Sequence, residues 1–221
     1  MTKYAIIVAA GRGLRMGAPI PKQFLRLLNK PVLLYSVQTF LETFPDIEII
    51  LVLPDEIPED LTAMIQELSR KHKVNRVTGG ETRFHSVRNG LDTIKKPGIV
   101  FVHDGARPLV SQKLLLRCYE QALQKGSAIP AIPVTDSIRQ INGNDSLPVS
   151  RDYLRIIQTP QTFRTELICP AFQCEYRPEF TDEATVAEAA GIKIWLVEGE
   201  KRNLKITTPD DMKVAEAMLA I

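Results

Sequence analysis

An apolar run leads directly into a glycine loop near the start of the chain, in the stretch Tyr4-Ala5-Ile6-Ile7-Val8-Ala9-Ala10-Gly11-Arg12-Gly13-Leu14-Arg15-Met16-Gly17. The length and the Val/Ile content of residues 4–10 are typical of a strand that is buried on both faces of a parallel sheet. Glycine and alanine after such a strand let backbone N–H groups approach an anion closely. The stretch therefore predicts a buried strand followed by a phosphate-binding turn, with an ordinary turn as the alternative.

Similar short apolar runs recur along the chain and alternate with amphipathic segments of helix length. The runs are residues 4–10, 47–53, 74–78, 99–103, 128–133 and 193–197. The helical segments are residues 31–44, 59–72, 83–94, 111–125 and 207 to about 220. This alternation predicts an α/β fold, a single Rossmann-like domain over residues 1–221 with a doubly wound, mostly parallel sheet. Ligands of such sheets bind at the carboxyl ends of the strands, near a topological switch point.

Residues 134–154 break this pattern, because no helical period runs through them. Ile138 and Ile141 flank polar residues, and a strong turn signal follows in Asn142-Gly143-Asn144-Asp145. We interpret the segment as an extended β-hairpin arm inserted into the sheet domain. The alternative is an irregular surface loop of about 20 residues, which would be unusual in a compact domain.

Composition is that of an ordinary soluble globular protein. The 221 residues carry a formal net charge of only +2, which argues against a dedicated nucleic-acid binder. The uncharged stretches are much shorter than the about 20 apolar residues that a membrane span needs. The three cysteines contain no Cys-x-x-Cys pair, so the sequence predicts neither a disulfide framework nor a thiolate zinc site. This cysteine usage indicates a reducing compartment, most simply the cytoplasm.

Charge is distributed unevenly despite the small net value. No acidic residue occurs before Glu42, whereas the same segment contains the cations Lys3, Arg12, Arg15, Lys22, Arg26 and Lys30. A solvated face is the ordinary interpretation of such a cluster. The glycine loop does not match a P-loop, because no Lys follows Gly17, and it fails the dinucleotide pattern because Met16 occupies the third glycine position. A phosphate site of another kind remains.

The glycine loop and five later blocks resemble sugar-phosphate nucleotidyltransferases. The loop block is Ala9-Ala10-Gly11-x-Gly13-x-Arg15-Met16-Gly17-x-x-x-Pro21-Lys22-Gln23-Phe24. The later blocks are Gly79-Gly80-Glu81-x-Arg83-x-x-Ser86-Val87-x-Asn89-Gly90-Leu91, Val102-His103-Asp104-x-Ala106-Arg107-Pro108, Gln158-Thr159-Pro160-Gln161-x-Phe163, Thr181-Asp182-Glu183-Ala184 and Asn203-Leu204-Lys205-Ile206-Thr207. Together they span nearly the whole chain and resemble the 2-C-methyl-D-erythritol 4-phosphate cytidylyltransferase family.

The resemblance implies an enzyme that joins CTP to 2-C-methyl-D-erythritol 4-phosphate and releases pyrophosphate, in non-mevalonate isoprenoid precursor biosynthesis. The attacking phosphate oxygen is already ionised, so catalysis reduces to positioning and to neutralising charge on the α-phosphate. The catalytic residues that the resemblance implies are Arg15, Lys22, Arg151 and Lys205. The implied nucleotide-binding residues are Ala9, Ala10, Gly11, Gly13, Gly80, Glu81 and Ser86.

The acceptor site implied by the resemblance gathers distant parts of the chain, namely Asp104, Arg107, Ser137, Arg151, Thr159, Thr181 and Lys205. Asp104 ends an apolar strand, where a buried carboxylate needs a partner. We assign it to the metal and substrate side, with a salt bridge to Arg107 as the alternative. The expected cofactor is Mg²⁺ or another divalent cation, which takes most of its ligands from substrate phosphates. His103 is expected to be a packed, hydrogen-bonded histidine.

The resemblance also implies a homodimer joined through the arm, which would place Arg151 in the neighbour's site. The expected partners are CTP and a polyol phosphate, with no nucleic acid and no membrane. Glu81 and Ser137 stand where the family commonly has Asp and Thr. Two alternatives stay open: a ribitol-5-phosphate cytidylyltransferase, which shares the glycine loop and the Gln-Thr-Pro-Gln block, and a non-catalytic nucleotide-binding module on the same fold.

Overall fold

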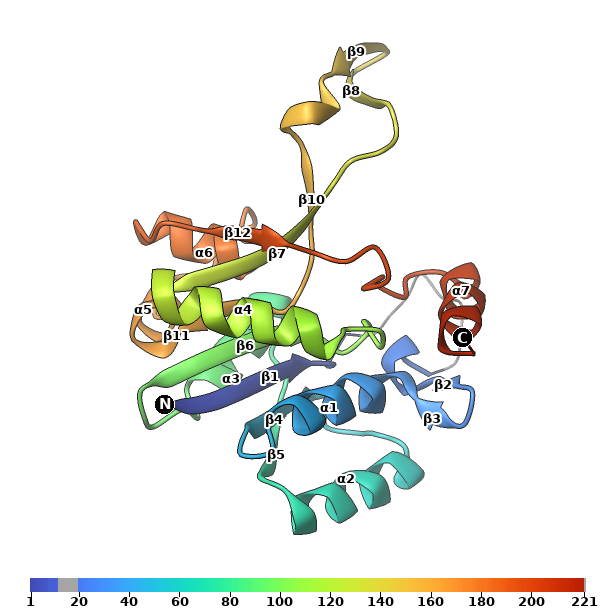
Figure 1. The fold of residues 1–221 in the computed structure, drawn as a ribbon, viewed down its shortest axis with the longest axis vertical. Helices are drawn as coiled ribbons and strands as arrows, with labels where there is room; N and C mark the ends of the chain where they lie inside the picture. The colour runs from blue at the N-terminus through green and yellow to red at the C-terminus, as the bar shows by residue number, and fades with distance from the viewer. Residues whose placement is uncertain (12–19, 221) are drawn as a thin grey trace.

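A mostly parallel sheet forms the centre of the computed structural model, which describes residues 1–11 and 20–220 (Figure 1). Within these residues its strands are β1 (Thr2–Val8), β4 (Glu48–Leu53), β5 (Val74–Thr78), β6 (Gly98–Asp104), β7 (Ser127–Pro133), β10 (Arg155–Ile157), β11 (Gln161–Arg164) and β12 (Leu196–Glu198). They lie in the order β10-β7-β11-β6-β1-β4-β5, and β12 pairs with β7. Only β10 and β11 run antiparallel to their described neighbours.

Helices cover both faces of this sheet. On one face α1 (Val32–Thr43), α2 (Glu59–Lys71) and α4 (Gln112–Lys125) pack against the strands, and on the other α3 (Arg83–Leu91), α5 (Thr165–Ala171) and α6 (Glu183–Ala189) do so. Figure 1 shows α1 and α4 in front of the sheet and α3 behind it. Successive strand residues point to opposite faces, so Ile6 and Ile7 of β1 are both fully buried, in different clusters. The predicted doubly wound, mostly parallel α/β fold is confirmed.

Local signals set several helix ends where the sequence predicts them. The Ser111 hydroxyl caps α4, and Gly126 ends that helix in the left-handed conformation, with φ 90°. Helix α7 (Pro209–Leu219) begins with a capping box between Thr208 and Asp211.

The structure differs from the sequence-based expectations in its short elements. The strand predicted over residues 193–197 lies instead at residues 196–198, as β12. The short elements α5, α6, β10 and β11 are absent from the expectations, because runs of three to seven residues carry little periodicity.

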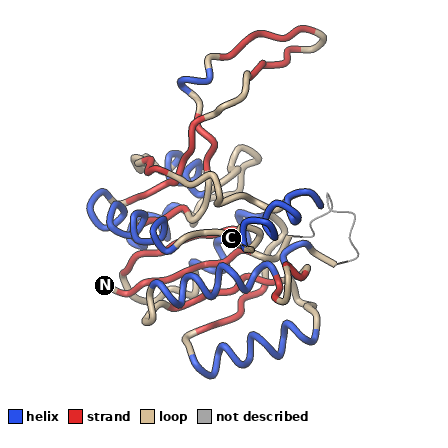
Figure 2. Tube along the Cα trace, turned by 45° about the vertical axis from the view of Figure 1, so that its right-hand side comes forward, coloured by secondary structure: helices blue, strands red, loops and turns tan. Residues whose placement is uncertain are grey.

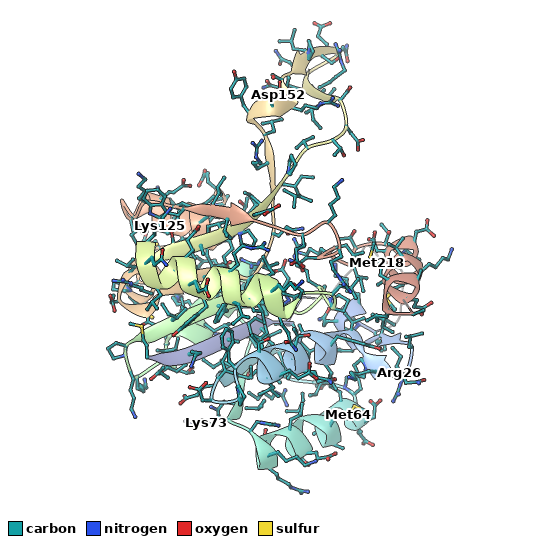
Figure 3. All side chains as sticks on the ribbon, in the orientation of Figure 1. Arg26, Met64, Lys73, Lys125, Asp152 and Met218 are labelled. Carbon is teal, nitrogen blue, oxygen red and sulfur yellow. The ribbon has the colours of Figure 1, made fainter. Side chains whose placement is uncertain are left out.

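Residues 134–154 form the arm, which stands clear of the sheet domain (Figures 1 and 2). Its strands β8 (Ile138–Asn142) and β9 (Asp145–Val149) pair antiparallel around a turn in which Gly143 has φ 59°. The 3-10 turn η3 (Arg151–Tyr153) then leads back toward the sheet, and Figure 3 shows Asp152 of this turn on the arm. The predicted hairpin is confirmed. Ile141 and Leu147 on it are 71% and 62% exposed.

The C-terminal segment packs beside the early part of the chain. A small core cluster joins Ala215 of α7 and Ile206 to Leu27 of the hairpin formed by β2 (Arg26–Leu27) and β3 (Lys30–Pro31). The backbone N–H of Ile206 also donates to the carbonyl of Ala106, at 2.9 Å. This packing brings Lys205 to the carboxyl end of β6. No helix in the described parts of the chain is long and apolar enough to span a membrane.

Candidate active site

The carboxyl ends of β1 and β6 lie side by side, at the point in the sheet where the strand order reverses. From β1 the chain proceeds to β4 and β5 on one side, whereas β6 lies on the other side of β1. Val8 pairs in register with Asp104, and the N–H of Gly105 donates to the carbonyl of Val8 at 2.9 Å. Residues 9–11, at the start of the glycine loop, and Asp104 therefore lie together at the topological switch point, where ligands of such sheets bind.

The buried side chain of Gln23 binds the backbone at the start of the glycine loop. The side-chain amide of Gln23 donates to the carbonyls of Ala9 and Gly11, at 2.7 and 2.8 Å. Gln23 belongs to the 3-10 turn η2 (Lys22–Phe24), so the same contacts place Lys22 next to the loop. The remaining loop residues with expected roles, Gly13 and Arg15, lie outside the described residues.

The turn expected to contact the nucleobase lies against the glycine loop. A Cβ added to Gly79 would be 2.2 Å from Cβ of Ala10, so the two loops approach this closely because position 79 has no side chain. The buried hydroxyl of Ser86 accepts a hydrogen bond from the N–H of Gly80, at 3.0 Å. The side chain of Glu81 is exposed. The expected nucleotide-binding residues brought together here are Ala9, Ala10, Gly11, Gly80 and Ser86.

Among the described residues, three cationic side chains surround the carboxylate of Asp104. The Nζ of Lys205 lies 2.9 Å from Oδ2, while Nη2 of Arg83 lies 3.2 Å from Oδ1 and Nε of Arg107 lies 3.5 Å from Oδ2. Burial opposes ionisation of Asp104, but the charges of Arg83, Lys205 and Arg107 outweigh it and hold the pKa of this carboxyl well below its usual range. The carboxylate is therefore ionised at neutral pH, and the expected salt bridge to Arg107 is one of the three ion pairs that it forms with described residues.

Arg83 also pairs with the fully buried carboxylate of Glu183, at the beginning of α6. Its Nη1 donates to Oε1 of Glu183, and its Nη2 lies 3.2 Å from Oε2. The sequence assigns no role to either residue, although both belong to blocks that carry the family resemblance. They are 100 positions apart and meet because α3 and α6 pack on the same face of the sheet.

A network of buried polar groups joins the three segments of the acceptor site. The hydroxyl of Thr159 accepts from the N–H of Asp104 at 3.0 Å, and Nδ2 of Asn203 donates to the carbonyl of Thr159 at 2.8 Å. Arg107 donates through Nη1 to the carbonyl of Asn203, at 2.8 Å. Thr159 thus uses its hydroxyl within the protein, and Asn203 is a supporting residue that the sequence does not single out. The network sets the position of Lys205 relative to β6.

His103 is packed and hydrogen-bonded, as the sequence predicts. It is fully buried, and its ring nitrogens lie 3.2 Å from both the carbonyl of Arg107 and the hydroxyl of Thr159. Burial lowers the pKa of His103 to about 4, so its imidazole is neutral at neutral pH. Its role is to support the end of β6.

Three residues expected at the acceptor site, Ser137, Arg151 and Thr181, lie away from the cluster around Asp104. Ser137 and Arg151 are exposed on the arm, where the guanidinium of Arg151 donates to the carbonyl of Thr135. Thr181 is exposed just before α6. Within residues 1–11 and 20–220, no ion pair joins Arg151 to Asp104. The structure of one chain therefore brings together Asp104, Arg107, Thr159 and Lys205 but leaves the arm residues outside.

The donor set around Asp104 does not fit a divalent cation held by protein groups alone. One carboxylate is surrounded by three cations, and the described residues contain no group of three His, Cys, Asp or Glu side chains that could hold a metal ion. Mg²⁺ prefers oxygen ligands and commonly takes them from substrate phosphates and water. A Mg²⁺ ion at Asp104 would therefore take most of its ligands from substrate phosphates and water.

The switch point of this doubly wound sheet combines a glycine loop with a cationic cluster. Together these features define the class of the protein, an α/β protein suited to binding phosphorylated ligands. The family model described as IspD, 2-C-methyl-D-erythritol 4-phosphate cytidylyltransferase, matches residues 3–221. The chain belongs to this family of nucleotidyltransferase enzymes.

Relatives and solved structures match over the full length. Proteins named 2-C-methyl-D-erythritol 4-phosphate cytidylyltransferase from Bacteroides fragilis and Bacteroides thetaiotaomicron are 44% and 45% identical to this chain, over 99% of this chain and 100% of each relative. The crystal structure of the protein of that name from Thermus thermophilus superposes with a TM-score of 0.76 at 32% identity, covering 98% of both chains.

Proposed function

We propose that the protein transfers the cytidylyl group of CTP to 2-C-methyl-D-erythritol 4-phosphate and releases pyrophosphate, as a step in isoprenoid precursor biosynthesis. Membership of the family, with relatives of that name at 44–45% identity over the full length, supports this reaction. The structural observation that carries it is the Lys205–Asp104–Arg107 cluster beside the glycine loop. Such an arrangement can hold a second phosphate next to a triphosphate.

The chemistry requires charge neutralisation more than proton transfer. An oxygen of the acceptor phosphate bonds to the α-phosphorus of CTP, and the bond from that phosphorus to the bridging oxygen breaks as pyrophosphate leaves. A phosphate monoester is largely a dianion at neutral pH, since its second pKa is about 6, so no general base is needed. Lys205 is the most exposed of the cations on Asp104, with 37% of its side chain accessible, which suits contact with the acceptor phosphate.

The remaining roles follow the family resemblance. Ala9, Ala10, Gly11 and Gly13 would bind the phosphates and ribose of CTP, and Gly80, Glu81 and Ser86 would bind its base. Arg15 and Lys22 would stabilise charge on the α-phosphate. A Mg²⁺ requirement is part of the proposal: CTP would bring the ion with its phosphates, and the carboxylate of Asp104 would contribute the protein ligand.

The arm supports a homodimer. Its side chains Ile141, Leu147 and Tyr153 are 71%, 62% and 89% exposed. Exposed apolar side chains that gather on one segment are typical of a protein–protein contact. Arg151 of the arm would then complete the site of the neighbouring subunit. Free thiols at Cys118, Cys169 and Cys174 are compatible with a cytoplasmic location.

A comparison of acceptors tests the reaction. The protein should release pyrophosphate from CTP in the presence of Mg²⁺ and 2-C-methyl-D-erythritol 4-phosphate, and EDTA should abolish this. Ribitol 5-phosphate should be a poor acceptor in the same assay. Turnover with ribitol 5-phosphate alone would favour the ribitol enzyme, and CTP binding without turnover on either acceptor would favour a regulatory module.

A mixing experiment tests the shared site. The single variants Arg151→Ala and Lys22→Ala should each be inactive, whereas a mixture that forms heterodimers should regain activity because one site then carries both native residues. Copurification through two different affinity tags, one on each variant, confirms that heterodimers form. Confirmed heterodimers that stay inactive would show that each site uses only its own arm.

A further inference from the structure

Arg83 bridges two carboxylates, of which only one belongs to the acceptor site as the family resemblance defines it. Its guanidinium contacts Oδ1 of Asp104 through Nε and Nη2, at 3.3 and 3.2 Å. The same guanidinium binds both carboxylate oxygens of Glu183. The described side chains therefore form a continuous line of charges from Glu183 through Arg83 and Asp104 to Lys205.

The two main cations on Asp104 bind different oxygens. Arg83 contacts Oδ1, whereas Lys205 contacts Oδ2 at 2.9 Å. Lys205 can therefore leave Asp104 without displacing Arg83. Because the Arg83 side chain is 29% exposed and that of Lys205 is 37% exposed, both lie close enough to solvent for an incoming phosphate to affect them.

Burial and the attachment of its helix to the sheet fix the position of Glu183. Its side chain is fully buried, which is unfavourable for a carboxylate unless a cation and hydrogen bonds compensate it. Its helix is tied to the sheet through Gln161, which accepts from the N–H of Ala184 at 2.8 Å and donates to Asp182 at 2.8 Å. A guanidinium that binds a fixed carboxylate through two nitrogens has a defined orientation. Glu183 thus sets the direction in which Arg83 faces Asp104.

We propose that Arg83, oriented by Glu183, is a positioning residue that holds Asp104 in place while Lys205 moves from Asp104 to the acceptor phosphate. The inference rests on the proposed cytidylyl transfer and adds a role for two residues outside its substrate contacts. When Lys205 turns to the phosphate, Arg83 and Arg107 still compensate the charge of Asp104. Without Arg83, Asp104 holds Lys205 more tightly and its less compensated charge repels the phosphate dianion.

This role predicts a kinetic effect on one substrate only. The variant Arg83→Met should raise KM for 2-C-methyl-D-erythritol 4-phosphate by about tenfold, the scale expected when a charged hydrogen bond is lost, and should change KM for CTP less than about twofold. Arg83→Lys keeps the charge but loses the two-nitrogen contact, so its acceptor KM should be intermediate. Arg88→Met, on the same helix, is the control and should match the wild type.

A second variant separates positioning from folding. Arg83→Met alone leaves Glu183 buried without its partner and can fail to fold. The double variant with Arg83→Met and Glu183→Met removes both charges, so it should fold, which a thermal melt confirms, and still show the raised acceptor KM. A folded double variant with wild-type KM for both substrates would refute the proposal, as would equal rises in both KM values. Absence of acceptor turnover in the wild type in the same assay would instead refute the proposed function, and the inference with it.

Discussion

The ammonium group of Lys205 lies 2.9 Å from Oδ2 of Asp104, so a residue of the C-terminal segment forms an ion pair with the end of a central strand. This contact places a cation at the switch point next to the glycine loop. It also keeps the lysine at the site before a substrate arrives, from where it can turn to the acceptor phosphate.

Replacing Lys205 with Met should lower kcat/KM for the acceptor by about 100-fold or more, because the variant loses a cation that faces developing charge. The thermal midpoint should change little, since the side chain is 37% exposed and Asp104 keeps its pairs with Arg83 and Arg107. Steady-state kinetics with each substrate varied in turn measures the effect. Lys201→Met, an exposed lysine of the same segment, is the control, and near-normal turnover of Lys205→Met would contradict the assigned role.

Gln23→Ala should weaken CTP binding and also destabilise the fold. The substitution leaves the carbonyls of Ala9 and Gly11 without the amide that now binds them at 2.7 and 2.8 Å. Loss of a buried hydrogen-bond partner costs about 1–3 kcal/mol, so Kd for CTP should rise by about tenfold. Isothermal titration with CTP and urea unfolding measure the two effects. Gln38→Ala, which removes an exposed glutamine of α1, should be close to wild type in both measurements.

Gly79→Ala should destabilise the protein, because the new methyl group would lie 2.2 Å from Cβ of Ala10. Overpacking of this kind costs about 1–3 kcal/mol, which lowers the Tm by roughly 2–4 °C per kcal/mol in a chain of this size. Gly11→Ala is the matched control, since an added Cβ there meets nothing within 4 Å. Adding Ala10→Gly to the Gly79→Ala variant should restore the lost stability, and a failure of this rescue would mean that the contact is not the cause.

Stability should fall between about pH 6.5 and pH 4 because of His103. Burial lowers the pKa of this imidazole to about 4, so the unfolded chain binds a proton in this range that the folded protein does not. The free energy of unfolding contributed by this group is fully present above about pH 6.5 and should be about 2 kcal/mol smaller at pH 5. Urea unfolding at both pH values tests this. His103→Gln should remove that part of the pH dependence, whereas His72→Gln, at an exposed position, should retain it.

Local patterns are sufficient for the central strands and most of the helices. The run of residues 4–10 is apolar on both faces because helices cover both sides of β1, and the turn signal of residues 142–145 has the Gly143 conformation that a tight hairpin needs. The caps at Ser111 and Thr208 act within one helical turn. Such features depend on neighbours a few residues away, so the order of residues specifies them directly.

Sequence motifs predict some residues of the candidate site, and the packing of the folded chain adds the others. The blocks that contain Asp104, Arg107 and Lys205 indicate a phosphate site, and the structure brings these three residues together. The bridge from Glu183 through Arg83 has no signal in the sequence beyond membership of a block, and neither has the clamp of Gln23 on the glycine loop. These contacts depend on distances between side chains on separate elements.

The order of residues therefore specifies the α/β architecture, the arm and the chemical type of the site, because strand and helix periods, turns and cation placement are local properties of the chain. Which groups balance the charge of Asp104 is a property of the folded molecule. Arg83, Arg107 and Lys205 come from α3, from the loop after β6 and from the segment before α7. Coulomb interactions depend on separation in space, which arises only when helices and loops pack against the sheet.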